Sequence, residues 1–320
     1  MKTYKKILLL FPIIFLFGFA VVKYNLTKTI NETVWVGSES EPTFLIESIN
    51  LNDSSSTNCE IFFIEVTNNC QTEGTINLSD PGTYQITYTA IYEDRAEIVS
   101  VQFLVLSEYY SSAAGKSGNE LLIELRSIMN STMQRVTYGE ARDILQETDQ
   151  DPNNANNLIT FYRQESVLST WDTGVTWNRE HIWPQSRLGV STSNDSRHVG
   201  ADLHNLKPEN PSENTSRGNK FFNNTTINGS YVPPENVRGD VARILFYMIL
   251  TYDYLKLVEE ETETLHQMGI YSTLLEWHFL DLPDEFEINR NNIIESYQGN
   301  RNPFIDYPLF WTLINYQLEE

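Results

Sequence analysis

Two runs of the sequence alternate between polar and apolar side chains, one over residues 84–90 and the other over residues 99–105. An alternation of period two places all the apolar side chains on one face of a β-strand. The turn signal Asp80-Pro81-Gly82 precedes the first run, and a charged tip at 93–95 separates the two runs. The pattern therefore predicts a β-hairpin with one buried face.

Earlier in the chain, short apolar runs at 34–36, 43–46 and 61–66 have the length of brief strands. Together with the hairpin they predict a small all-β sandwich over residues 29–106. The segment "PGTYQITYTA" in the hairpin resembles the last strands of bacterial surface immunoglobulin-like domains. The resemblance implies a spacer or adhesive module, and no residue of this region suggests chemistry.

The apolar residues change to a period of 3.6 after a small, polar segment at 107–119. A helix is expected over residues 121–129, with Ser117 or Asn119 as its cap. A second helix is expected over the apolar run 239–258.

Between these helices, residues 157–222 mix short strand-like runs with loops rich in His, Asn and Arg. The acidic and polar stretch 259–287 is typical of a solvated surface. The chain is therefore expected to be multidomain, with the sandwich followed by an α+β domain over residues 107–320.

The N-terminus carries three lysines, at positions 2, 5 and 6, before an uncharged apolar run at 7–22. This is the pattern of an export signal with a basic leading region. Gly18-Phe19-Ala20 is a poor cleavage site, and the run is slightly short for a spanning helix, so residues 1–28 are either a cleaved signal peptide or an uncleaved membrane anchor. Both alternatives place the rest of the chain outside the cytoplasm, secreted or held at the outer face of the cell membrane.

The chain has two cysteines, Cys59 and Cys70. In an exported protein they are able to close a short disulfide loop, and two free thiols are the alternative.

The formal net charge of −21 argues against long-range attraction to a polyanion. Three of the five histidines lie between positions 181 and 204, and the window 176–220 holds six basic and five acidic residues. Nucleic-acid binding would require such local compensation, which this window permits without proving.

Glu180 and His181 stand side by side in this window. A zinc protease site on a helix is disfavoured because the glutamate precedes the histidine and Pro184 follows closely. A serine hydrolase is disfavoured because the chain has no G-x-S-x-G segment. A hard cation such as Mg²⁺ would suit one carboxylate and one amide oxygen, and would leave the histidine free to act as a base.

The segments "NREHIWPQS", "DLHNLKP" and "ENTSRGNK", in this order and spacing, resemble the endonuclease I family of ββα-metal nucleases. The resemblance extends through "YYSSAAGKSG", "RGDVARILFYM" and "ESYQGNRNPFIDYP", and so covers residues 108–309. It implies a ββα-metal core surrounded by helices, in which a strand ends in the catalytic histidine, a second strand returns and a short helix delivers a metal ligand.

Within that resemblance, His181 corresponds to the general base that activates water, and Glu180 to the carboxylate ligand of one Mg²⁺. Asn214 corresponds to the amide ligand on the helix that starts near Pro211, and Arg217, one turn later, is expected to hold a phosphate. Mn²⁺ and Ca²⁺ would suit the same oxygen ligands. The alternatives are a surface charge for Glu180 and a turn cap for Asn214.

Other residues are expected to support these groups or only to pack. The supporting set is Arg179, His204, Asn205 and Asn219, with Lys220 as a weaker phosphate contact. Trp177 and Trp183 are expected to be packing residues and the "YQGNRNPF" segment a structural turn, and Arg197 or His198 is a further candidate for a phosphate contact.

The sequence thus predicts an exported, metal-dependent endonuclease with little sequence preference, with DNA as the expected substrate and RNA as the alternative. The resemblance to endonuclease I implies 5′-phosphate products. It predicts no obligate protein partner. The rival hypothesis is a surface adhesion or interaction protein with an inactive nuclease-like domain. The intact set of Glu180, His181 and Asn214 argues against inactivity.

Overall fold

A computed structural model of the protein describes residues 27–35, 60–61, 66–67, 70–75, 77, 80–92, 95–226 and 229–318. The chain divides into two compact units, Met1–Lys116 and Ser117–Glu320. The boundary was expected after residue 106, whereas the two units divide after Lys116. The difference arises because a 3₁₀ helix, η1 (Glu108–Ala113), still belongs to the first unit.

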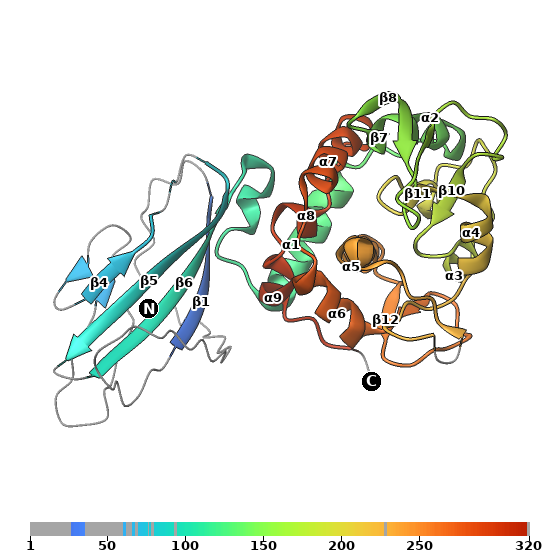
Figure 1. Cartoon of the computed structure of the whole chain (residues 1–320). Coiled ribbons are helices and arrows are strands. Elements are labelled where there is room, and N and C mark those ends of the chain that lie inside the picture. Colours follow the sequence, from blue (N-terminus) through green and yellow to red (C-terminus); the bar gives the residue numbers. More distant parts are fainter. Residues whose placement is uncertain are drawn as a thin grey trace. The chain divides into compact units, whose positions relative to one another are not determined.

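The first unit contains a four-stranded sheet in the order β1-β6-β5-β4. Strands β5 and β6 pair antiparallel, with Tyr84 opposite Phe103 and Ile86 opposite Val101, which confirms the hairpin. Strand β1 lies parallel to the other edge of β6, and β4 lies antiparallel to β5 (Figure 1). The bounds are β1 (Thr27–Trp35), β4 (Cys70–Glu73), β5 (Gly82–Tyr92) and β6 (Arg95–Leu106).

The prediction of one strand over residues 61–66 is wrong. Ile61 and Val66 face each other across two short antiparallel strands, β2 (Glu60–Ile61) and β3 (Val66–Thr67). The immunoglobulin-like sandwich stays a prediction.

Several other expectations fall on residues outside the described ranges. These are the apolar run 7–22, the strand at 43–46 and the Cys59 half of the disulfide. Within the part of the chain that the structure describes, no helix combines the length and the apolar character needed to cross a membrane.

The second unit is an α+β arrangement around helix α5 (Arg238–Thr251), which Figure 1 shows end-on. Helix α5 is almost completely buried, with apolar side chains around most of its surface and the ion-paired Arg243 in its interior, as expected for the centre of a domain. It contacts α1, α6 and α8. The other longer helices are α1 (Gly118–Thr132), α2 (Tyr138–Thr148), α6 (Tyr271–Leu280) and α7 (Glu285–Gln298), and the two short C-terminal ones are α8 (Pro303–Asp306) and α9 (Phe310–Ile314).

The long helix expected over 239–258 is too long. Helix α5 ends at Thr251, and the chain continues into β12 (Lys256–Val258), which pairs parallel with β13 (Gln267–Gly269). The next residue, Tyr252, leaves the helical conformation, and its hydroxyl donates to the buried Asp202 at 2.7 Å. A tertiary hydrogen bond therefore accompanies the end of the helix.

The prediction that residues 259–287 form a solvated surface is also wrong for part of this stretch. Four of its acidic residues precede β13 and five follow it, and α6 buries Leu274, Trp277 and His278. Trp277 and His278 lie three and four positions after Leu274, so all three turn toward the same side of the helix.

The strand–strand–helix unit that positions the site is made of β10 (Asn178–His181), β11 (Leu206–Glu209) and α4 (Pro211–Arg217). The two strands pair antiparallel, and α4 lies beside β10 (Figure 1). The start expected near Pro211 is confirmed: Asn210 caps α4 by accepting from the backbone of Ser212 at 2.9 Å, and proline stands at the first helical position.

A small sheet and short helices complete the surroundings of the site. A cluster of buried side chains, including Trp177, Leu203 and Leu206, packs these segments against α2 and α7. The remaining elements are β7 (Gln150–Asp151), β8 (Asn154–Ile159), β9 (Ser166–Leu168), α3 (Gln185–Leu188), η2 (Val199–Ala201) and η4 (Glu235–Val237).

Candidate active site

Strand β10 ends at His181, as the sequence indicated, and its pairing fixes the direction of the two central side chains. Glu180 lies opposite Lys207 and His181 opposite Leu206. Because neighbouring residues of a strand point to opposite faces, Glu180 and His181 project to different sides of β10.

On the first face, Glu180 is 2% exposed. Its Oε1 accepts from the Tyr162 hydroxyl at 2.9 Å and pairs with the Arg217 guanidinium at 3.0 Å. Burial raises the pKa of Glu180 to about 7, although both partners favour the ionised form. Both side-chain contacts go to Oε1, and the His181 backbone N–H also favours the ionised carboxylate. Oε2 receives neither side-chain contact, so it is the oxygen able to face an ion.

Asn214 comes from α4 to the same face of β10. Its side-chain nitrogen donates to the Asn178 side-chain oxygen at 2.7 Å and to the backbone carbonyl of Arg179 at 3.3 Å. A backbone carbonyl only accepts, so the amide nitrogen must face it, and the Asn214 oxygen Oδ1 turns the other way.

One carboxylate oxygen and one amide oxygen are hard ligands, and they fit a cation that keeps most of its waters. No group of three or more His, Cys, Asp or Glu side chains able to hold a metal occurs among the described residues. Glu180 and Arg217 also cancel each other's formal charge. The donor set therefore suits a weakly held Mg²⁺-like ion better than zinc.

On the second face, His181 donates from Nε2 to the Gly200 carbonyl at 2.8 Å. The carbonyl cannot donate, so this contact requires the proton on Nε2 and leaves the lone pair of the neutral ring on Nδ1. Burial lowers the pKa of His181 to about 4. At neutral pH the imidazole is therefore uncharged, with Nδ1 able to accept a proton.

Arg217 lies in a different position from the one expected for a phosphate contact. Its side chain is completely buried, and Nη1 donates to the His181 carbonyl at 2.8 Å as well as pairing with Glu180. The guanidinium also covers the Phe222 ring at 4.4 Å. Because it is enclosed, Arg217 braces β10 and balances the Glu180 charge, and it does not present a phosphate site.

Asn205 and His204 brace the site through hydrogen bonds, as expected. Asn205 accepts from the Trp183 backbone nitrogen at 2.7 Å and donates to the Trp183 carbonyl at 3.1 Å, which fixes the chain just after His181. His204 is buried, and its Nε2 lies 3.3 Å from the Asn300 carbonyl in the "YQGNRNPF" segment. That segment is structural here.

The other expected residues fall into two groups. Trp177 and Trp183 are completely buried packing residues, as predicted. The exposed or half-exposed ones contact protein groups: Asn219 accepts from Arg187 through its carbonyl, Lys220 donates to Ser216, Arg197 pairs with Glu140, and His198 caps η2. Arg179 lies on the His181 face and donates to the Tyr138 carbonyl.

Sequence reasoning missed four contributors to the site: Tyr162, Glu209, Tyr138 and Gly200. Glu209 is fully buried and accepts from the Tyr162 backbone, and burial raises its pKa to about 7. Tyr138 stacks on His181 with ring centroids 5.6 Å apart. Of these four, only Glu209 has a local signal in the sequence. It lies two residues after Lys207 on the same strand, so the two side chains share a face.

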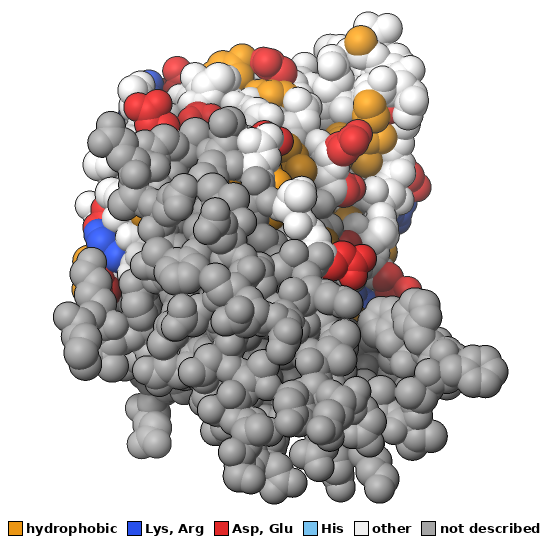
Figure 2. Space-filling view, turned by 90° about the vertical axis from the view of Figure 1, so that its left-hand side faces the viewer, with side chains coloured by type: hydrophobic (Ala, Val, Ile, Leu, Met, Phe, Trp, Pro, Cys, Tyr) orange, Lys and Arg blue, Asp and Glu red, His pale blue; other side chains and the backbone are white. Residues whose placement is uncertain are grey.

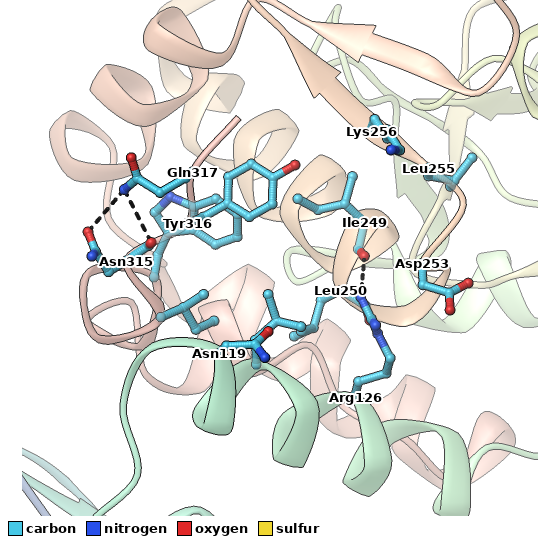
Figure 3. Close-up of a pocket in the computed structure, with 13 residues that line it drawn as sticks. Asn119, Arg126, Ile249, Leu250, Asp253, Leu255, Lys256, Asn315, Tyr316 and Gln317 are labelled. Carbon is cyan, nitrogen blue, oxygen red and sulfur yellow. Dashed lines mark hydrogen bonds between the residues drawn. The ribbon is translucent and has the colours of Figure 1, made fainter. Parts of the chain in front are cut away.

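A cavity of about 380 Å³ lies elsewhere in the second unit, between α1, the end of α5 and the segment after α9 (Figure 3). Arg126, on its wall, donates to the Leu250 carbonyl at 2.7 Å. None of the expected site residues lines this cavity.

A buried carboxylate, an oriented amide oxygen and a neutral histidine on a strand–strand–helix unit are the polar groups of a hydrolase site. The chain belongs to the endonuclease I family, whose sequence pattern matches residues 117–309. It is a nuclease.

Named relatives agree with this family. The chain is 36% identical over 241 residues to an extracellular ribonuclease of Bacillus amyloliquefaciens, covering 69% of this chain and 82% of the relative. It is 39% identical over 221 residues to an extracellular ribonuclease of Bacillus subtilis (strain 168), covering 62% and 75%. An Endonuclease-1 of Buchnera aphidicola subsp. Baizongia pistaciae is 26% identical over 159 residues, covering 44% and 60%.

Proposed function

We propose that the protein is a secreted endonuclease that uses one divalent ion, Mg²⁺ in the first place, to hydrolyse phosphodiester bonds of DNA and RNA. The observation that carries this proposal is the orientation of three groups around the end of β10. The proton on Nε2 of His181 fixes Nδ1 as an acceptor, while Glu180 Oε2 and Asn214 Oδ1 remain for the ion.

In the proposed reaction, His181 Nδ1 takes a proton from a water that attacks phosphorus, the bond to the 3′-oxygen breaks, and the leaving 3′-oxygen takes a proton from a solvent water. The products are a 5′-phosphate and a 3′-hydroxyl, as the family resemblance implies. The ion, held by Glu180 and Asn214, would supply charge stabilisation for the phosphate and the leaving oxygen. Gly200 holds the base in the required tautomer through its carbonyl.

Attack by water does not need the 2′-hydroxyl of RNA, so this chemistry is open to both polymers. The names of the two Bacillus relatives support RNA as a substrate, and the Endonuclease-1 relative supports the wider class. No base readout is proposed, because the site chemistry acts on the phosphate alone.

Secretion is supported by the basic and apolar N-terminal pattern and by the word "extracellular" in the names of the relatives. An uncleaved anchor remains the alternative form of export, and mass spectrometry of the exported protein distinguishes the two by the presence or absence of residues 1–28.

The test is incubation of the full chain with supercoiled plasmid and, separately, with a single-stranded RNA, in Mg²⁺ or in EDTA. Nicking and RNA cleavage that require Mg²⁺, with 5′-phosphate ends detected by ligation, support the proposal. Absence of cleavage of both polymers at every Mg²⁺, Mn²⁺ and Ca²⁺ concentration would overturn it and favour an inactive interaction protein.

A further inference from the structure

Beside the candidate base, five side chains form a continuous series of rings and guanidinium groups, here called the Arg–aromatic row: His181, Tyr138, Arg179, Trp171 and Arg142. The Arg179 carbon Cζ lies 3.6 Å from the Tyr138 ring centre and 5.6 Å from that of Trp171. The Arg142 Cζ lies 5.8 Å from the Trp171 ring centre. The row therefore runs from the base toward α2.

Local geometry brings these residues together from three segments. Arg179 and His181 are two positions apart on β10, so they share a face. Tyr138 and Arg142 are four positions apart on α2, so they share a helical face. Trp171 reaches between the two elements from the loop after β9, where its edge packs on the buried Trp177 at 5.0 Å between ring centroids.

Stacking on a ring occupies the flat face of a guanidinium and leaves N–H groups at its edge. Arg179 donates one hydrogen bond, to the Tyr138 carbonyl. In the region that the structure describes, no carboxylate forms an ion pair with Arg179, whereas Arg197 pairs with Glu140 at 3.4 Å. Arg179 thus keeps donors next to the base, and the Asp143 carboxylate acts on its charge without forming an ion pair with it.

Arg142 does have a carboxylate partner, Asp143, at 2.8 Å. The two side chains are 31% and 59% exposed, and ion pairs this open to water contribute little. A phosphodiester carries the same single negative charge as a carboxylate and accepts from the same guanidinium edge, so it is able to replace Asp143.

The row contrasts with the remainder of this acidic chain. The face shown in Figure 2 carries more acidic than basic side chains on its described residues, and the formal net charge of the protein is −21. A polyanion repelled by the overall charge requires a local cationic path to reach the site.

We propose that the Arg–aromatic row binds the phosphodiester backbone of the substrate on one side of the cleaved bond, through the edges of Arg142 and Arg179. The rings hold the two guanidinium groups in place, which lowers the ordering cost of binding. The ligand is the phosphate chain of a polynucleotide, read without regard to base or sugar. This inference rests on the proposed function, because it assumes that a polynucleotide occupies the site at His181.

Two charge changes of opposite direction test the row. Arg142→Gln removes a phosphate contact, so the Kd for a fluorescein-labelled single-stranded oligonucleotide should rise about tenfold at low salt. The slope of log Kd against log salt should fall by about 0.7, the value for one contact on a single strand. Asp143→Asn removes the competing carboxylate, so the Kd should fall severalfold. Anisotropy titrations in EDTA, with DNA and RNA versions of the strand, measure both.

A third variant changes no charge. Trp171→Leu removes the ring under Arg142 and one of the two rings beside Arg179, so Kd and KM should rise severalfold while kcat at saturating substrate stays the same. Trp171→Phe should restore most of the affinity. The matched control is Arg238→Gln, because Arg238 lies over the Trp277 ring at 5.6 Å in a segment outside the row. Its Kd and KM should equal those of the wild type.

The outcomes separate the two proposals. Unchanged Kd, KM and salt slope in both Arg142→Gln and Asp143→Asn, in a wild-type chain that cleaves, would overturn the row and leave the nuclease function standing. A wild-type chain that cleaves nothing with Mg²⁺ contradicts the proposed function. Oligonucleotide binding in EDTA with the opposite shifts described above supports the row, and melting temperatures within a few degrees of the wild type exclude unfolding as the cause.

Discussion

The two faces of β10 place neighbouring residues in different chemical surroundings. The Glu180 side holds a hydroxyl and a guanidinium, from Tyr162 and Arg217, whereas the His181 side holds an aromatic ring and a backbone carbonyl. Burial drives both residues toward their neutral forms, with a pKa of about 7 for Glu180 and about 4 for His181.

This shift toward the neutral form has opposite consequences for a base and for a cation ligand. A base must be neutral before it takes a proton, so burial prepares His181 without further help. A cation ligand must be ionised, so burial works against Glu180, and the charge of Arg217 and the Tyr162 hydroxyl counteract it. The ligand Glu180 therefore has two polar side chains beside it, whereas the base His181 needs one acceptor, the Gly200 carbonyl.

The largest effect is expected from Glu180→Gln. The variant loses the charged ligand, so Mg²⁺ affinity measured by calorimetry should fall below detection and cleavage should drop to the EDTA level. It also leaves the Arg217 charge buried without its carboxylate, which should lower the free energy of unfolding by about 3 kcal/mol. Wild-type Mg²⁺ affinity in this variant would show that Glu180 is not a ligand.

His181→Ala should lower kcat by about 10² to 10⁴, the usual contribution of a general base, and leave Mg²⁺ affinity within about twofold of the wild type. Added imidazole should restore part of the activity. His266→Ala is the control, because His266 contacts Tyr254 and none of the site residues. If activity survives His181→Ala unchanged, the assigned base is wrong even though the protein is a nuclease.

His278 sharpens the comparison by separating burial from catalysis. It is fully buried in α6, its Nε2 donates to the Pro308 carbonyl at 2.9 Å, and burial lowers its pKa to about 4. Its folded pKa lies below the unfolded value of about 6.5, so the unfolded chain binds the proton more readily. The stabilisation is therefore present above about pH 6.5 and is lost as the pH falls toward 4.

Between pH 7 and pH 5, His278 should account for a loss of about 2 kcal/mol in the free energy of unfolding. His278→Phe should show a loss smaller by that amount, measured by urea denaturation at both pH values. An equal loss in the variant and the wild type would mean that His278 titrates normally and that burial in this unit does not depress a histidine pKa.

The smallest effect is expected from Tyr162→Phe. It removes one of the two groups that favour ionised Glu180 and keeps the ring, so the apparent Mg²⁺ affinity at pH 7 should fall by about threefold to tenfold. Saturating Mg²⁺ should restore the wild-type kcat. A fall in kcat at saturating Mg²⁺ would instead assign Tyr162 a part in the chemical step.

Local patterns were sufficient for much of the fold near the site. Strand β10 ending at His181 and α4 starting at Pro211 follow from a short polar strand and from an Asn-Pro cap, which are features of adjacent residues. The hairpin β5–β6 follows in the same way from its alternation. The end of α5 at Thr251 does not, because the following residue bonds to Asp202, about fifty positions earlier in the chain.

The candidate site divides in a similar way. Glu180, His181 and Asn214 are predicted from the motifs in which they stand, and Asn205 makes the hydrogen bonds expected of a brace. A phosphate contact was expected for Arg217 because its spacing from Asn214 puts both residues on one side of a helix. In the structure the Arg217 side chain is instead completely buried. Spacing on a helix fixes direction, and burial depends on which distant segment covers that direction, here Phe222.

By itself, the sequence determined the family and the residues proposed for the chemistry, because both follow from short ordered motifs. It also determined that Glu180 and His181 face opposite sides, since the period of a strand is local. Only the tertiary structure decided what each side contains. Tyr162, Arg217, Gly200 and Tyr138 reach the two residues from separate segments, and the pKa values depend on those long-range contacts and on the water they exclude.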